Sequence, residues 1–143
     1  MKELVILACS KTKIWDKGFI PSAQKVKAKD AYIGTVFIYG KKYAEKHKLP
    51  YLIISAKYGL LKPNQLIKNY NKKLLNKTDA LQIKIKFKNQ IKKLFNNYNK
   101  IFLIGGNKYY RIVFEGLNDK KFNYIKSKSL GFLLKKVKNL AEK

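Results

Sequence analysis

The sequence predicts a single α/β domain over residues 1–143, built as a three-layer sandwich around a central, mainly parallel sheet of four strands. Two observations predict this fold. Short apolar runs alternate along the chain with longer segments of helical periodicity, and no repeat or domain linker interrupts the series. Apolar residues also make up 46% of the chain, which at this length allows a real core.

Each predicted strand is a short apolar run, as expected of parallel strands that are buried on both faces. The four runs are residues 4–8, 51–54, 101–104 and 122–125. Right-handed crossovers place the carboxyl end of every strand at one edge of the sheet, where ligands bind in open α/β folds. Four polar segments are therefore predicted to meet there: Cys9-Ser10, Ser55-Ala56-Lys57, Gly105-Gly106 and Lys126-Ser127.

Helices are predicted between the strands from apolar residues spaced three and four apart. They cover about 30–48, 78–98, 108–117 and a last segment after residue 129. Asp30, Thr78 and Ser129 are residue types that cap helix starts, and each precedes one of these segments. The connections 11–29 and 60–77 are unusually long for a compact domain, and such loops are usually functional or mobile.

The charge is strongly unbalanced, with 33 basic against 8 acidic residues and a formal net charge of +25. Such a charge favours a polyanionic partner, and nucleic acid is the obvious candidate. However, only Arg111 is an arginine, and the abundance of Ile, Asn, Tyr and Lys is expected of a genome biased towards A and T. Composition therefore explains the charge equally well, although either origin would draw a polyanion to the surface.

Several classes of protein are not indicated. No apolar run approaches the roughly 20 residues that span a bilayer, and the start of the chain is too quickly interrupted for a signal peptide. The lone Cys9 cannot form an internal disulfide, and the eight carboxylates, one histidine and one cysteine show no metal-ligand spacing. We therefore expect a cytoplasmic protein with no membrane association, no metal and no other cofactor.

The segment CSKTK, residues 9–13, follows the first strand and brings a thiol, hydroxyls and amines together. Ser10, Lys11 and Lys13 suit phosphate binding, and the lysines can also lower the pKa of Cys9. The alternative for Cys9 is an inert residue at a strand end. No base is apparent, because His47 lies at the end of a predicted helix.

Asp30 and Tyr32 follow the first long connection. Asp30 is either a plain helix cap or a carboxylate aimed into the crevice, where it would serve as a general base. Tyr32 is either a stacking surface for a base or one of ten largely structural tyrosines.

The segment SAKYGLLKP, residues 55–63, follows the second strand. Lys57 there can bind a phosphate or a carbonyl oxygen, or act as an amine when desolvated; the alternative is a solvated lysine at the start of a loop. Tyr58-Gly59 indicates a turn in which Gly59 takes positive φ. Gly105-Gly106 opens a helix after the third strand, a weak signal for anion binding.

Taken together, these segments resemble a small family of uncharacterised α/β domains. That family carries C-S-x-x-K, Y-x-G-x-x-F and S-A-K-Y-G-L-L in this order, and residues 9–13, 32–37 and 55–61 match them. It is similar to the YaaA-type peroxide-stress proteins, whose relatives bind DNA, and to the catalytic domain of archaeosine synthase. The latter works on a deazaguanine base in tRNA and carries P-C-S-x-x-K-P-Y, from which this chain departs at Ala8 and at Ile14-Trp15.

The resemblance implies a site that faces a nucleobase or nucleotide. It is built from Cys9, Ser10, Lys13, Asp30, Tyr32, Gly34, Ser55, Lys57 and Tyr58.

Two main hypotheses follow. In the first, the protein is an enzyme that acts on a base or glycosidic bond in tRNA or DNA, with Asp30, Lys57 and Cys9 as catalytic residues. The expected substrate-binding residues are Ser10, Lys11, Lys13, Tyr32, Gly34, Ser55, Tyr58, Gly59, Gly105 and Gly106. In the second, it is a basic nucleic-acid-binding module without chemistry. A third possibility is a stress protein that binds a free nucleotide.

Overall fold

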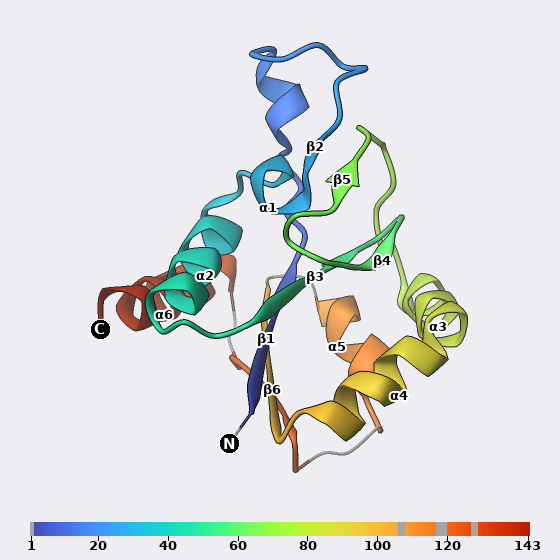
Figure 1. The fold of residues 1–143 in the computed structure, drawn as a ribbon, viewed down its shortest axis with the longest axis vertical. Helices are drawn as coiled ribbons and strands as arrows, with labels where there is room; N and C mark the ends of the chain where they lie inside the picture. The colour runs from blue at the N-terminus through green and yellow to red at the C-terminus, as the bar shows by residue number, and fades with distance from the viewer. Residues whose placement is uncertain (1, 106–107, 117–119, 127–128) are drawn as a thin grey trace.

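The computed structural model describes residues 2–105, 108–116, 120–126 and 129–143. Within them, a five-stranded sheet crosses the molecule in the order β4–β3–β1–β6–β7 (Figure 1). Its strands are β1 (Glu3–Ala8), β3 (Tyr51–Ser55), β4 (Gly59–Leu61), β6 (Lys100–Ile104) and β7 (Phe122–Tyr124). All neighbours pair in parallel except β4, which is antiparallel to β3. The fold is thus mixed α/β around a mostly parallel sheet.

The four predicted strands are confirmed, with ends that differ by a residue or so, but the predicted number of strands is wrong. The fifth strand, β4, forms a hairpin with β3 in which Ser55 faces Gly59. Gly59 has φ +69°, so the predicted positive φ is confirmed and is what lets the chain reverse. Three residues are too few to show an alternating pattern, which is why the sequence did not indicate this strand.

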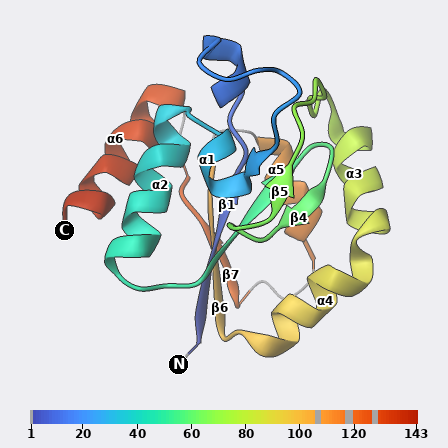
Figure 2. The same ribbon diagram turned by 45° about the horizontal axis from the view of Figure 1, so that its top comes forward.

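Helices lie on both sides of the sheet (Figures 1 and 2). α2 (Thr35–Lys46) and α6 (Leu130–Glu142) pack together on one side, and α3 (Lys77–Lys86), α4 (Lys88–Asn97) and α5 (Lys108–Phe114) lie on the other. β1 supplies both cores, because its alternate side chains point to opposite faces. Leu4 and Ile6 join the cluster with α3, α4 and α5, whereas Val5 and Leu7 join the cluster with α2 and α6.

The first predicted helix is interrupted. α1 (Ala28–Ala31) ends before Tyr32, which forms an isolated antiparallel bridge with Lys13, and α2 starts only at Thr35. Gly34 has extended backbone at the N-cap of α2. Asp30 lies inside α1, so it does not cap the helix as predicted. The close approach of the first long connection breaks the helix here, and this contact is not visible in the local sequence.

The second predicted helix is divided at Phe87 into α3 and α4, and its cap is Asn76 rather than Thr78. The Asn76 side chain accepts a hydrogen bond from the Asp79 backbone N–H at 2.9 Å. The predicted cap of the last helix is confirmed, because Ser129 Oγ accepts a hydrogen bond from the Phe132 N–H at 3.2 Å. None of the described helices is both long enough and apolar enough to cross a bilayer.

The two long connections contain short elements that pair with each other. The first holds a 3₁₀ helix, η1 (Ile14–Lys17), and β2 (Val26–Lys27); the second holds β5 (Leu66–Ile67). β2 and β5 form a two-stranded antiparallel ribbon near the carboxyl ends of the parallel strands (Figure 1). The ribbon ties both connections to the edge where the polar segments were predicted to meet.

Candidate functional site

A pocket of about 880 Å³ opens at the carboxyl edge of the sheet. Its walls come from the exit of β1, the start of α2, the segment Tyr70–Leu75, the start of α5 and the start of α6. The walls are separate in sequence and are brought together by the parallel topology, as the position of this edge predicts.

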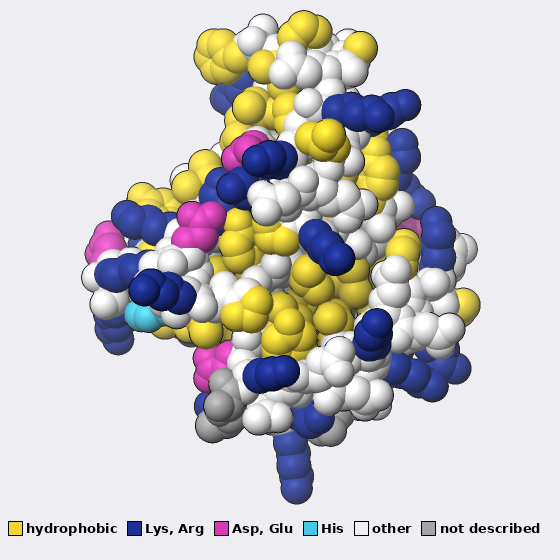
Figure 3. Space-filling view, in the orientation of Figure 1, with side chains coloured by type: hydrophobic (Ala, Val, Ile, Leu, Met, Phe, Trp, Pro, Cys, Tyr) yellow, Lys and Arg dark blue, Asp and Glu magenta, His cyan; other side chains and the backbone are white. Residues whose placement is uncertain are grey.

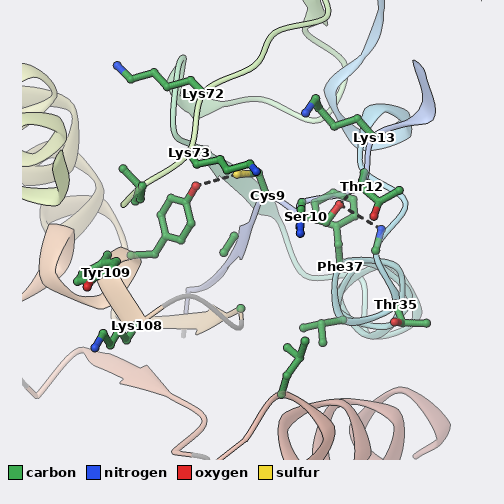
Figure 4. A pocket seen from close by; sticks show the side chains of 18 of the residues that line it. Cys9, Ser10, Thr12, Lys13, Thr35, Phe37, Lys72, Lys73, Lys108 and Tyr109 are labelled. Atoms are coloured by element: carbon green, nitrogen blue, oxygen red, sulfur yellow. Dashed lines mark hydrogen bonds between the residues drawn. The ribbon is translucent and has the colours of Figure 1, made fainter. Parts of the chain in front are cut away.

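The lining of the pocket is cationic. Five lysines contribute to it, and the described lining residues include no Asp, Glu or His. These lysines are Lys11, Lys13, Lys72, Lys73 and Lys108, and Figure 4 shows four of them on different sides of Cys9. Among the described residues, a single pair of Lys or Arg with Asp or Glu lies within 4.0 Å, between Lys100 and Glu3 at the opposite end of the sheet. The pocket lysines therefore have no carboxylate partner in the part of the chain that the structure describes, and they favour an anionic ligand.

The rest of the lining is amphipathic. Hydroxyl and amide groups come from Ser10, Thr12, Thr35 and Asn71. Apolar and aromatic surface comes from Val36, Phe37, Leu74, Tyr109, Tyr110 and Leu134. A ligand that fits this lining has both a charged part and a flat or apolar part.

Cys9 lies at the end of β1 in this pocket, half-buried, with its Sγ 2.8 Å from the Tyr110 hydroxyl (Figure 4). Burial raises the pKa of the Cys9 thiol, and the Tyr110 hydrogen bond and the Lys13 charge offset only part of this. Burial also raises the pKa of Tyr110, and the neighbouring Cys9 adds to the effect. Both groups therefore keep their protons at neutral pH, so the pair is poorly suited to nucleophilic attack but can donate hydrogen bonds to a ligand.

Ser10 holds the β1 exit against the start of α2. Its Oγ donates to the Thr12 carbonyl at 2.6 Å and accepts the Gly34 N–H at 3.1 Å. A Cβ on Gly34 would lie 2.5 Å from the Ser10 Cβ, so only glycine allows this approach. Both residues line the pocket, but the hydroxyl of Ser10 already has partners within the protein.

Ser55 ends β3 and is fully buried, with 0% of its surface exposed. Its Oγ accepts the backbone N–H groups of Lys57 and Tyr58, each at 3.2 Å, and donates to the Tyr70 hydroxyl at 3.0 Å. The Tyr70 hydroxyl lies 2.6 Å from that of Tyr32. Burial raises the pKa of both phenols, and the nearby Cys9 adds to the shift, so this network is neutral.

Lys57 and Asp30 do not line the pocket. Lys57 is exposed, with its Nζ 5.2 Å from the centre of the Tyr58 ring. Asp30 is exposed as well. Burial and the neighbouring Glu45 raise the pKa of Tyr51, and the charge of Asp30 adds to this shift.

Six residues of the predicted site lie in the pocket lining. These are Cys9, Ser10, Lys11, Lys13, Gly34 and Gly105. Tyr32, Ser55, Tyr58 and Gly59 are not part of the lining, and the first three contact it through Tyr70. Gly106 and Ser127 fall outside the described residues.

Sequence reasoning missed several lining residues, above all Tyr70, Lys72, Lys73, Lys108 and Tyr110. Lys108 and Tyr110 follow the glycine pair closely, and that proximity was a usable signal. Tyr70 and the two lysines sit in a connection without periodicity, so nothing local placed them at the site. Within the described part of the chain, no three His, Cys, Asp or Glu residues cluster as metal ligands would.

Comparison with known proteins places the chain in a family. It belongs to a family of unknown function (DUF6884), whose model matches residues 4–131 and so includes every pocket-lining residue except Leu134. It is also 32% identical over 111 residues to "Uncharacterized protein YfjM" of Bacillus subtilis (strain 168). That alignment covers 76% of this chain and 73% of the relative. No solved structure matches.

Proposed function

We propose that this family member is an enzyme whose pocket binds a nucleotide unit, free or within tRNA or DNA, and acts on its base or glycosidic bond. The observation that carries the proposal is the pocket lining, in which five lysines and no described carboxylate surround apolar and aromatic surface. A nucleotide combines a phosphate with a flat base, so it suits both parts of this lining. The position at the carboxyl edge of what we take to be a three-layer sandwich agrees with this class of ligand.

In this proposal the lysines hold phosphate and the Cys9–Tyr110 pair faces the reacting atoms. Lys11 and Lys13 approach from the β1 exit, and Lys72 and Lys73 approach from the segment after β5. The neutral thiol and phenol would donate hydrogen bonds to the base or to the leaving group as negative charge develops there. The proposal gives Asp30 and Lys57 no role in the chemistry, since both are exposed and outside the lining.

Binding is tested with two matched pairs of adjacent lysines. Lys72→Ala/Lys73→Ala removes two charges from the pocket lining, whereas Lys92→Ala/Lys93→Ala removes two exposed charges from α4. Fluorescence anisotropy with a labelled single-stranded RNA of about 12 nucleotides measures Kd. We expect the pocket variant to bind at least about tenfold more weakly, which is about 1.4 kcal/mol, and the α4 variant to stay within about twofold.

Chemistry is tested by incubating wild-type protein with RNA, DNA and free nucleotides and analysing the products by mass spectrometry. We expect a released or altered base, which Cys9→Ser and Tyr110→Phe abolish or slow by about 100-fold, in the range seen when a hydrogen-bond donor to developing charge is removed. The RNA affinity of these variants should change little. Product formation at wild-type rates in both variants would remove the pair from the mechanism.

The second candidate is the basic binding module without chemistry. It is favoured by the spread of lysines over the molecule, since Figure 3 shows Lys and Arg scattered across the visible face, around exposed hydrophobic surface and with fewer carboxylates. A module that grips the phosphate backbone would lose affinity equally in the two double-lysine variants and would show a steep salt dependence. That result, with no product from any nucleic acid or nucleotide, would favour the module over the enzyme.

A further inference from the structure

The pocket wall formed by Tyr70–Leu75 has no helix or strand of its own, yet it carries Lys72 and Lys73. We infer that Tyr70 is the positioning residue of this wall: its hydroxyl, held by Ser55, keeps the two lysines in the geometry that binds the anionic part of the ligand. The inference rests on the proposed function, because it takes the pocket as the ligand site.

Four side chains converge on Tyr70. Its hydroxyl contacts Ser55 Oγ at 3.0 Å and the Tyr32 hydroxyl at 2.6 Å. Its ring meets the Tyr58 ring edge-on at a centroid distance of 5.4 Å, and Lys13 Nζ lies 4.9 Å from its centre. Tyr70 therefore connects the exits of β1 and β3, and the segment that follows it starts from a fixed point.

The Tyr70 hydroxyl takes part in both of these hydrogen bonds, so it is the group on which the position of the wall depends. Ser55 Oγ accepts two backbone N–H groups, so its own proton goes to the Tyr70 oxygen. The Tyr70 hydroxyl also shares a hydrogen bond with the Tyr32 hydroxyl across the 2.6 Å contact, in which either oxygen can be the donor. Removing the Tyr70 hydroxyl breaks both bonds, whereas removing the Tyr32 hydroxyl leaves the bond between Ser55 and Tyr70.

The charges around the pocket explain why a neutral anchor suits this wall. Lys11 and Lys13 on one wall and Lys72 and Lys73 on the other carry like charges around a pocket with no described carboxylate. Their repulsion drives the irregular wall outwards when no anion is bound. A neutral hydrogen-bonded anchor holds the wall in place without adding a carboxylate, which would itself repel an anionic ligand.

The test compares Tyr70→Phe, Ser55→Ala and their combination with Tyr32→Phe as the matched control. Hydrogen exchange by mass spectrometry follows peptides covering residues 68–76, and anisotropy gives Kd for the single-stranded RNA of about 12 nucleotides. We expect Tyr70→Phe and Ser55→Ala to raise exchange in this segment and to weaken binding about tenfold. Tyr32→Phe should stay within about threefold. Because both variants break the same hydrogen bond, between Ser55 and Tyr70, the double variant should bind no more weakly than the worse single variant.

Two outcomes would overturn the inference. One is wild-type affinity and exchange in Tyr70→Phe. The other is equal effects of Tyr70→Phe and Tyr32→Phe on both measurements, which would indicate general loss of packing. If the wild-type protein binds neither the RNA nor free nucleotides, the proposed function fails, and the exchange of residues 68–76 alone then decides whether Tyr70 anchors the wall.

Discussion

The exits of β1 and β3 leave neighbouring parallel strands at the same edge, yet they serve the molecule differently. After β1, Cys9–Lys13 runs along the pocket and presents a thiol and two lysines to it. After β3, the chain reverses at Gly59 into β4, so Ser55 is sealed in and Lys57 is turned to solvent. Sharing an edge is therefore not sufficient for sharing a site, because the path that the chain takes after the strand decides where its side chains point.

The difference also changes the interpretation of the SAKYGLLKP segment, residues 55–63, as part of the site. None of its residues lines the pocket; Ser55 and Tyr58 contact Tyr70, which does line it. The β1 exit is exposed to a ligand and the β3 exit is a buried scaffold behind it. The predictions below test this division, starting from the largest expected effect.

The β3 hairpin should be most sensitive at Gly59. A Cβ there would collide with the Phe87 ring while φ is +69°, whereas Gly18 has a similar φ of +74° with nothing within 4 Å. We expect Gly59→Ala to lower the free energy of unfolding by about 3 kcal/mol, from backbone strain plus overpacking, and Gly18→Ala by about 1 kcal/mol. Urea denaturation measures both, and equal losses would contradict the packing role given to Gly59.

Alkaline pH should destabilise the folded protein through three buried phenols near the pocket. Burial is the main reason why the pKa values of Tyr32, Tyr70 and Tyr110 lie above 10.0. Above about pH 10 the unfolded chain loses these protons and the folded chain keeps them, so the unfolding free energy falls as pH rises, by about 1.4 kcal/mol per pH unit for each phenol. Urea titrations from about pH 9 to about pH 11 should show a shallower fall in Tyr110→Phe, and an unchanged slope would contradict this assignment.

Cys9 should react slowly despite its place in the pocket. Burial raises its pKa above 9.0, so little thiolate is present near pH 8. We expect iodoacetamide to alkylate the folded protein about tenfold more slowly than the same protein in urea. Equal rates would mean that the thiol is activated, and Cys9 would then return as a candidate nucleophile.

Lys57 should have the smallest effect. It is exposed and outside the lining, whereas Lys13 lines the pocket beside Tyr70. We expect Lys57→Ala to leave the RNA Kd within about twofold and Lys13→Ala to weaken it about fivefold, or about 1 kcal/mol. A larger loss in Lys57→Ala would place the β3 exit in the binding surface and remove the contrast between the two exits.

The sequence by itself determined the parallel strands and the edge at which their polar ends meet. Runs such as 51–54 and 101–104 are apolar because strands buried on both faces must be, and this signal is local. The same logic placed Cys9, Lys13 and Gly105 at the pocket, since each lies at or shortly after the end of its strand, before the chain can diverge.

Tertiary structure alone decided the rest. The break between α1 and α2 depends on the approach of Ser10 to Gly34, and the hairpin after β3 depends on the space left by Phe87. Tyr70 is held at the pocket by a hydrogen bond from Ser55, which lies 15 residues away in the sequence. Such contacts produce no periodic pattern in the sequence, because they depend on which segments meet in space and not on the residues that are neighbours along the chain.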